Sequence, residues 1–228
     1  MHIGTVIGVV VVEVKKNRQS NGASTTSDSN SSVSGSSTRG NSPSASSTSG
    51  ASNPVATDFP LDPNLHKSFY GLAYTPVGAI MPECGANIAD VRKDMQKLSQ
   101  LTTRLRLYGS DCNVTSLVLQ AITDLKVDVK VFPGIYLEAE DLSYTRQKKI
   151  LEDALTVYGT DHVLGVTLGN EYLLIASNAG DTVENATARV VEKMNEVRTD
   201  LTALGFRLPV GTSETGGGVS QTIVDNAD

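Results

Sequence analysis

The clearest hydrophobic pattern in the chain is the apolar run at residues 163–168, which stops abruptly at Asn170 and Glu171. A short apolar run of this kind predicts a strand buried on both faces, as in parallel sheets covered by helices. In strand-helix barrels the chemistry lies at the carboxyl ends of the strands, where these two polar residues fall. Glu171 is therefore a candidate proton donor. The competing interpretation is that Asn170 and Glu171 only cap the next helix.

Other segments with strand and helix patterns surround this run. We predict strands at 69–74, 103–108, 127–132 and 208–213, the third ended by Pro133 and Gly134. Apolar residues at helical spacing predict helices with inward faces at 88–98, 114–125, 150–158 and 190–201. Asn87 is the expected N-cap of the first, and a capping-box-like segment at 181–184 begins the last.

Strands that alternate with helices through right-handed crossovers leave two architectures, a doubly wound sheet or a barrel. No Gly-x-Gly-x-x-Gly motif follows the first predicted strand, and the sequence has no Walker loop. A nucleotide-binding sheet is therefore disfavoured.

The first 67 residues show no such pattern. Residues 3–12 are apolar but span only half the length needed to cross a bilayer, and basic residues follow them. Three interpretations compete for this segment: the end of a transmembrane anchor, the apolar part of a signal peptide, and an isolated strand. The basic residues follow the apolar stretch, which favours the anchor. We predict an anchor remnant at 1–18, a disordered Ser/Thr-rich stalk at 19–67 and a barrel domain at 68–228.

Composition excludes some classes of binding partner. The net charge of −6 and pI of about 5.1 provide no basic surface for nucleic acid. The histidines are scattered, and Cys84 and Cys112 lie far apart, so we predict no metal site and no cofactor.

The two cysteines form either a disulfide, which would imply a secretory compartment, or two buried thiols. Arg106 is either a ligand-facing cation or part of an internal ion pair. Asn30, Asn113 and Asn185 begin glycosylation sequons.

Several longer motifs carry a family resemblance. The segments 69–76, 82–85, 101–112, 166–171 and 209–213, in this order, resemble the fungal endo-β-1,3-glucanases of glycoside hydrolase family 17. The apolar N-terminal segment followed by a Ser-rich stalk is similar to the membrane-anchored type II members. The resemblance covers about residues 68–228.

The resemblance implies an α/β fold, the (β/α)8 TIM barrel, of which about the first five βα units would be present. It also implies retaining hydrolysis of cell-wall β-1,3-glucan without a metal or cofactor. We expect a monomer at the cell membrane facing the wall, or secreted. A non-catalytic glucan-binding protein and a β-1,3-glucan transglycosylase are the alternatives.

Residue roles follow from the same resemblance. Glu171 matches the acid/base glutamate, and Asn170 matches the asparagine that holds the sugar 2-hydroxyl. Tyr70, Arg106 and Tyr108 match positions that line the cleft. Cys84 and Cys112 match a bridged pair.

The chain departs from the family pattern at its C-terminal end. Ser213-Glu-Thr-Gly216 imitates the string that contains the family's nucleophile after strand seven. Here it follows the fifth predicted strand, with one predicted helix between that strand and Glu171. We therefore interpret Glu214 as a look-alike and expect that the nucleophile and strands six to eight are missing from the chain.

Overall fold

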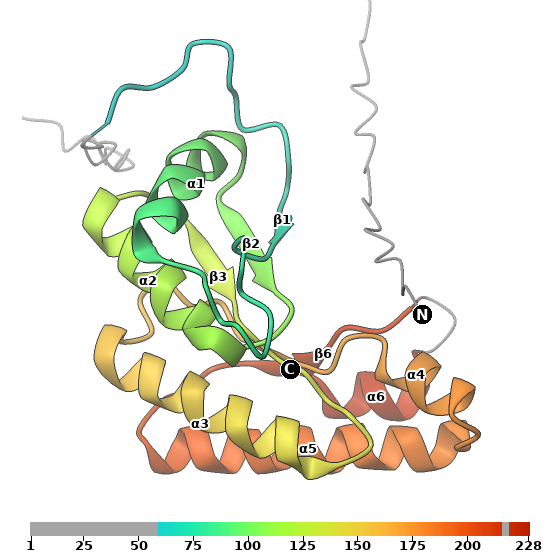
Figure 1. Cartoon of the computed structure of the whole chain (residues 1–228). Helices are drawn as coiled ribbons and strands as arrows, with labels where there is room; N and C mark the ends of the chain where they lie inside the picture. Colours follow the sequence, from blue (N-terminus) through green and yellow to red (C-terminus); the bar gives the residue numbers. More distant parts are fainter. Residues whose placement is uncertain (1–58, 216–218) are drawn as a thin grey trace, which may run out of the picture. The chain divides into compact units, whose positions relative to one another are not determined.

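The computed structural model describes residues 59–215 and 219–228, within the second of two units into which the chain divides, Met1–Asn53 and Pro54–Asp228 (Figure 1). The predicted anchor at 1–18, most of the predicted stalk and Asn30 lie outside the described residues. Among those described, Phe59 packs against the hydrophobic core, and the backbone N–H of Asp62 donates to the Gln100 side chain.

The strands are short, and all their pairings are parallel. β1 (Leu72–Tyr74), β2 (Arg104–Leu107) and β3 (Lys130–Phe132) form one sheet in that order. β4 (Gly134–Ile135), β5 (Val166–Leu168) and β6 (Val210–Thr212) form a second. An isolated parallel bridge between Val131 and Val163 links the two, so strand order follows chain order throughout.

The predicted end of the third strand is confirmed, because β3 stops at Phe132, directly before Pro133. Pairing to β2 stops there, but the chain continues as β4 and pairs with β5. Pro133 lacks an N–H donor, yet its carbonyl oxygen still accepts a 2.9 Å hydrogen bond from the Thr167 N–H. The proline therefore marks both the end of β3 and a change of pairing partner from β2 to β5.

Gly134 makes this change of partner possible. A Cβ atom there would lie 2.4 Å from the Leu107 carbonyl oxygen and 2.8 Å from two backbone atoms of Tyr108. Backbone atoms within paired strands cannot move aside as a flexible side chain can. Only glycine allows β4 to pass so close to the end of β2.

We expect Gly134→Ala to lower the free energy of unfolding by about 3 kcal/mol, the upper part of the usual range for overpacking. Urea denaturation followed by circular dichroism measures it. Gly85→Ala is the matched control, because a Cβ there meets nothing within 4 Å. Equal denaturation midpoints for the two variants would contradict the argument.

The helices confirm most of the predicted pattern. The structure has α1 (Ile88–Leu101), η1 (Asp111–Asn113), α2 (Val114–Leu125), α3 (Asp141–Tyr158), α4 (Tyr172–Asn178), α5 (Val183–Ala203) and α6 (Gln221–Asn226). Asn87 caps α1 as predicted, through a 3.1 Å hydrogen bond from the Asp90 N–H. The cap of α5 is Thr182, inside the predicted capping segment.

Two helical features were not predicted. α3 begins at Asp141, well before residue 150, because its first turns bury Ser143 and Gln147 as well as Tyr144, and polar residues hide the apolar pattern. The short helices α4 and α6 offer too few turns for a periodic pattern. α3 and α5 run side by side (Figure 1), joined by Lys148, which contacts both Glu196 and Asp200.

The two faces of the strands differ. Leu105, Leu107 and Val131 are almost fully buried in the core that the strands share with the helices. Their neighbours Arg104, Arg106 and Phe132 point to the other face and are partly exposed. Within residues 59–215 and 219–228, no helix is long and apolar enough to cross a membrane.

Candidate active site

Asn170 and Glu171 lie where the sequence predicts, directly beyond the carboxyl end of β5. Gly169 has φ of +75°, and Glu171 itself has left-handed backbone angles (φ 54°, ψ 36°) before α4 begins. The Glu171 N–H donates a 2.7 Å hydrogen bond to the Ser213 carbonyl oxygen, beyond the end of β6. A non-glycine residue in this region is strained, so the surrounding backbone must hold it. The Glu171 side chain is left exposed at the strand ends.

Glu171 does not cap the next helix with its side chain. It occupies the N-cap position of α4, yet its side chain makes no capping hydrogen bond. Glu214 does this instead: one carboxylate oxygen accepts from the Leu173 N–H (3.1 Å) and the other from the Thr212 hydroxyl (3.2 Å). The capping interpretation of Glu171 was therefore wrong, and its carboxylate makes no hydrogen bond within the described residues.

Arg106 joins two of the predicted site residues. Its Nη2 donates a 2.9 Å hydrogen bond to the Asn170 side-chain oxygen, and its guanidinium lies 4.7 Å from the centre of the Tyr108 ring. Burial lowers the pKa of Arg106, and the nearby groups Tyr108 and Glu171 partly oppose this. Arg106 makes no ion pair within the described residues, so the structure favours a cation that orients Asn170 over an internal salt bridge.

Tyr136, just after β4 at the carboxyl end of the strands, is a candidate site residue that the sequence does not predict. Burial raises the pKa of its hydroxyl, as do the charges of Glu138 and Glu171. The feature that could have identified Tyr136 is an aromatic residue directly after a strand. The sequence does not place it there, because the strand before it, β4, has only two residues and shows no pattern.

Tyr70 does not join this group. It precedes β1, and its ring stacks with Arg104 at the beginning of β2, 4.5 Å from the guanidinium to the ring centre. Since the strands are parallel, this is their amino end, opposite to Asn170 and Glu171. The structure therefore contradicts the prediction that Tyr70 lines the same cleft.

The predicted cysteine pair is bonded. Cys84 and Cys112 form a disulfide that connects the loop after β1 with η1, and their Cα atoms are 4.8 Å apart. The sequon residue Asn113 is exposed, while Asn185 hydrogen-bonds Asp181 from the first turn of α5. Glycosylation of either stays a prediction. Among the described residues, no group of three or more His, Cys, Asp or Glu side chains could hold a metal ion.

Glu214 should make stability depend on pH. Burial raises its pKa, and the Glu171 charge adds to this, while hydrogen bonds from Leu173 and Thr212 oppose it. The folded protein therefore holds this proton more tightly than the unfolded chain does. The resulting stability is complete below the ordinary glutamate pKa and is lost as pH rises through the raised value.

We expect Glu214→Gln to remove this pH-dependent contribution. The wild type minus variant difference in unfolding free energy should fall as pH rises from about 4 to about 7. Loss of one acceptor should cost about 1 kcal/mol at all pH values. Urea denaturation at several pH values measures both effects, with the exposed Glu192→Gln as control. A difference that rises with pH would contradict the assigned direction.

Comparison with known proteins decides the family. A family model described as the BtgE/BtgC glycoside hydrolase domain matches residues 71–228. The chain belongs to this glycoside hydrolase family. The resemblance to fungal endo-β-1,3-glucanases is thereby confirmed.

A glucan endo-1,3-beta-glucosidase, btgC, of Emericella nidulans is 36% identical over 169 residues, covering 72% of this chain and 26% of the relative. The chain thus spans about a quarter of the length of the curated relatives that it matches.

Solved structures confirm the fold over the matched part. A β-1,3-glucanosyltransferase of Rhizomucor miehei, solved as an active-site mutant with laminaritriose, has a TM-score of 0.54 at 22% identity, covering 70% of this chain and 55% of that one. An endo-laminarinase from Formosa has a TM-score of 0.58 at 15% identity, covering 72% and 49%. The α/β fold with parallel strands is thus shared with family 17 enzymes.

Proposed function

We propose that this chain forms the acid/base part of a retaining glycoside hydrolase that cleaves β-1,3-glucan. The observation that carries the proposal is the group at the carboxyl end of the strands. The Glu171 side chain is exposed and makes no hydrogen bond to any described residue, and it lies next to Asn170, which Arg106 orients. In this arrangement Glu171 protonates the leaving oxygen and Asn170 holds a sugar hydroxyl. Tyr108 and Tyr136 offer ring faces to the sugar. The name of the btgC relative supports β-1,3-glucan as the substrate.

A retaining mechanism needs a second carboxylate, about 5 Å from the first, to attack the sugar. We propose that Glu214 is not this nucleophile. Both of its oxygens already accept hydrogen bonds, from Leu173 and Thr212, and it follows the strand adjacent to that of Glu171. In the proposed mechanism it holds the start of α4, and a residue outside the described part attacks the sugar.

We also propose that the strands described are five units of a (β/α)8 barrel, β3 and β4 together making the third. The uneven burial of their two faces supports this. Arg104, Arg106 and Phe132 lie on the face that would line the inside of a closed barrel, and all three are only partly buried. Further strands would cover them.

Binding and turnover of glucan test the proposal separately. Calorimetric titration with laminaritriose should show binding to this chain, and Arg106→Ala should weaken it. Reducing-sugar release from a linear β-1,3-glucan measures hydrolysis by a protein with the complete barrel. Binding to insoluble glucan without release of reducing sugar would favour the glucan-binding alternative, and longer products from defined oligosaccharides would favour a transglycosylase. No binding of laminaritriose would refute the substrate assignment.

We propose a location on the cell surface, facing the wall. The Cys84–Cys112 disulfide supports it, because such bonds persist in oxidising compartments. Labelling of intact cells with a membrane-impermeant reagent should reach the protein; labelling only after lysis would contradict this.

A further inference from the structure

Gln147 is a buried amide on α3 that is fully engaged in hydrogen bonds. Its side-chain oxygen accepts from the N–H groups of Ser110 (2.9 Å) and Tyr136 (3.0 Å). Its side-chain nitrogen donates to the Asp111 carboxylate (3.0 Å) and the Ser143 hydroxyl (3.2 Å). Only 2% of the residue is exposed. One side chain therefore satisfies two backbone donors in two different loops.

Those loops are the ones that follow β2 and β4 at the carboxyl end of the strands. Tyr108 stands two residues before Ser110 and stacks on Arg106, while Tyr136 is itself a donor to Gln147. The intervening Gly109 shows how close the approach is, since a Cβ atom there would lie 2.6 Å from the Gln147 oxygen. Gln147 thus sets the spacing between the two loops that carry the tyrosines of the site.

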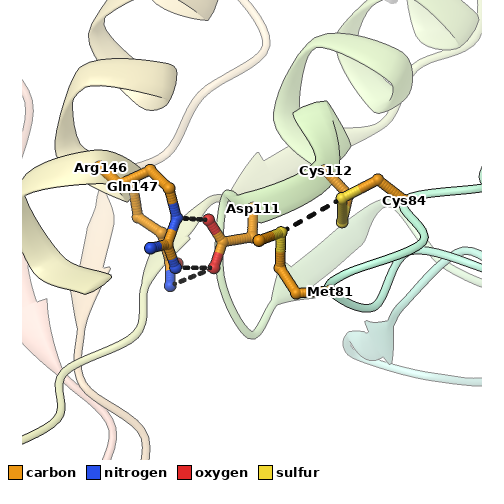
Figure 2. The surroundings of a disulfide bond; sticks show 6 residues. All are labelled: Met81, Cys84, Asp111, Cys112, Arg146 and Gln147. Atoms are coloured by element: carbon orange, nitrogen blue, oxygen red, sulfur yellow. Dashed lines mark hydrogen bonds and ion pairs between the residues drawn. A yellow bond between two sulfur atoms is a disulfide. The ribbon is translucent and has the colours of Figure 1, made fainter. Parts of the chain in front are cut away.

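Asp111 fixes which way the amide points. Figure 2 shows Arg146 and Gln147 reaching the same carboxylate: Arg146 donates to both oxygens, at 2.7 and 2.8 Å, and Gln147 donates to the second. A carboxylate in a salt bridge only accepts hydrogen bonds, so Gln147 must present its nitrogen to Asp111. Its oxygen then faces the two backbone N–H groups. Reversing the amide would set its oxygen against the Asp111 carboxylate and its nitrogen against the two N–H donors.

We propose that Gln147 is a positioning residue, which holds Tyr108 and Tyr136 at the separation that a β-1,3-glucan chain needs. The assignment of glucan as ligand rests on the proposed function. The positioning role rests on the hydrogen bonds alone. Gln147 touches no substrate and acts only through the two loops.

Gln147→Glu tests this because its effect should depend on pH. When ionised, the introduced carboxylate cannot donate a hydrogen bond to Asp111, and the two negative charges repel each other. The charge of Glu138, which also acts on Arg146, adds to the negative charge there. When protonated, the introduced carboxyl group offers an O–H to Asp111 and a carbonyl oxygen to Ser110 and Tyr136, as the glutamine does. The neighbouring Asp111 carboxylate favours protonation, while Arg146 and the N–H groups of Ser110 and Tyr136, which donate to the side-chain oxygen, oppose it.

We expect laminaritriose affinity of Gln147→Glu to fall by about tenfold or more relative to wild type at pH 8, and to recover largely at pH 5. NMR should show the ring signals of Tyr108 and Tyr136, and the amide signals of Ser110 and Tyr136, shifting with the same pH midpoint. Gln147→Met, which keeps the side-chain volume without hydrogen bonds, should lose affinity at both pH values. Lys149→Gln, exposed on the same helix, is the control and should change nothing.

Each outcome has a definite meaning. The proposal would be overturned if both variants bound laminaritriose with wild-type affinity and only the hydrogen exchange of the Ser110 and Tyr136 backbone amides became faster. Gln147 would then have only a structural role. Failure of wild type to bind laminaritriose would refute the proposed function. The NMR titration would still decide on positioning, since unmoved tyrosine rings would overturn it. If Gln147→Met does not fold, Gln147→Glu at the two pH values is sufficient.

Discussion

Glu171→Gln should remove nearly all hydrolysis of β-1,3-glucan by a protein that contains this chain and a complete barrel. The amide keeps the shape of the side chain but cannot deliver a proton to the leaving oxygen, a contribution worth about 10²- to 10⁴-fold. Reducing-sugar release from a linear glucan measures the loss. Activity on an aryl glycoside with a good leaving group should survive better, because that group departs without protonation. Equal losses on both substrates would contradict the acid/base role.

Glu214→Gln is the matched comparison, since both carboxylates lie at the same end of neighbouring strands. It should lose less than Glu171→Gln on both substrates, because Glu214 holds the start of α4 through Leu173. A nucleophile variant would lose both substrates together, and azide would restore turnover with an α-glycosyl azide as product. Azide rescue of Glu214→Gln would show that Glu214 attacks the sugar and that our strand assignment is wrong.

The contrast between these two glutamates shows what the sequence could predict. The position of Glu171 followed from an apolar strand ending in a polar pair, a purely local pattern. The sequence also indicated that Glu214 follows a different strand. It could not show that Glu214 caps α4, because that bond joins residues 41 positions apart. Local patterns place side chains at strand ends, whereas bonds between loops depend on tertiary packing.

Tyr70 and Tyr136 also show that the sequence does not fully determine which residues lie at the carboxyl ends of the strands. Motif resemblance grouped Tyr70 with the cleft, but the residue lies before β1, at the opposite end of the strands. The sequence does not predict Tyr136, because the residue follows β4, a strand of two residues that is too short to show a pattern. In both cases the bounds of the neighbouring strand, β1 or β4, determine at which end of the strands the tyrosine lies. A shift of a few residues along a strand exchanges one end of a sheet for the other.

Gln147 was outside the reach of sequence reasoning for a different reason. A glutamine within a helix usually faces solvent, and nothing in the local pattern marks this one as buried. Its burial depends on partners in two other loops, Ser110 and Tyr136. The close approach of Gly109 to the Gln147 oxygen is likewise a tertiary contact, between residues far apart in the chain.

The disulfide gives the second large effect that we expect. Replacing both Cys84 and Cys112 by serine should lower the free energy of unfolding by about 3 to 4 kcal/mol, from the chain-entropy model for a bond across 28 residues. Urea denaturation of the oxidised wild type and the double variant measures the difference. Wild type treated with reductant is the control and should match the variant. Recovery of both cysteines as free thiols in non-reducing peptide mapping would show that the bond is absent.

This stabilisation should act mainly through the unfolded chain, which the bond restricts. The folded double variant should then bind laminaritriose as the wild type does, even though it unfolds at lower urea. The bond joins the loop after β1 to η1, which begins at Asp111, the residue that orients Gln147. Loss of affinity in the double variant well below its denaturation midpoint would therefore mean something further. It would show that the disulfide also holds the folded loops around Tyr108 and Tyr136 in place.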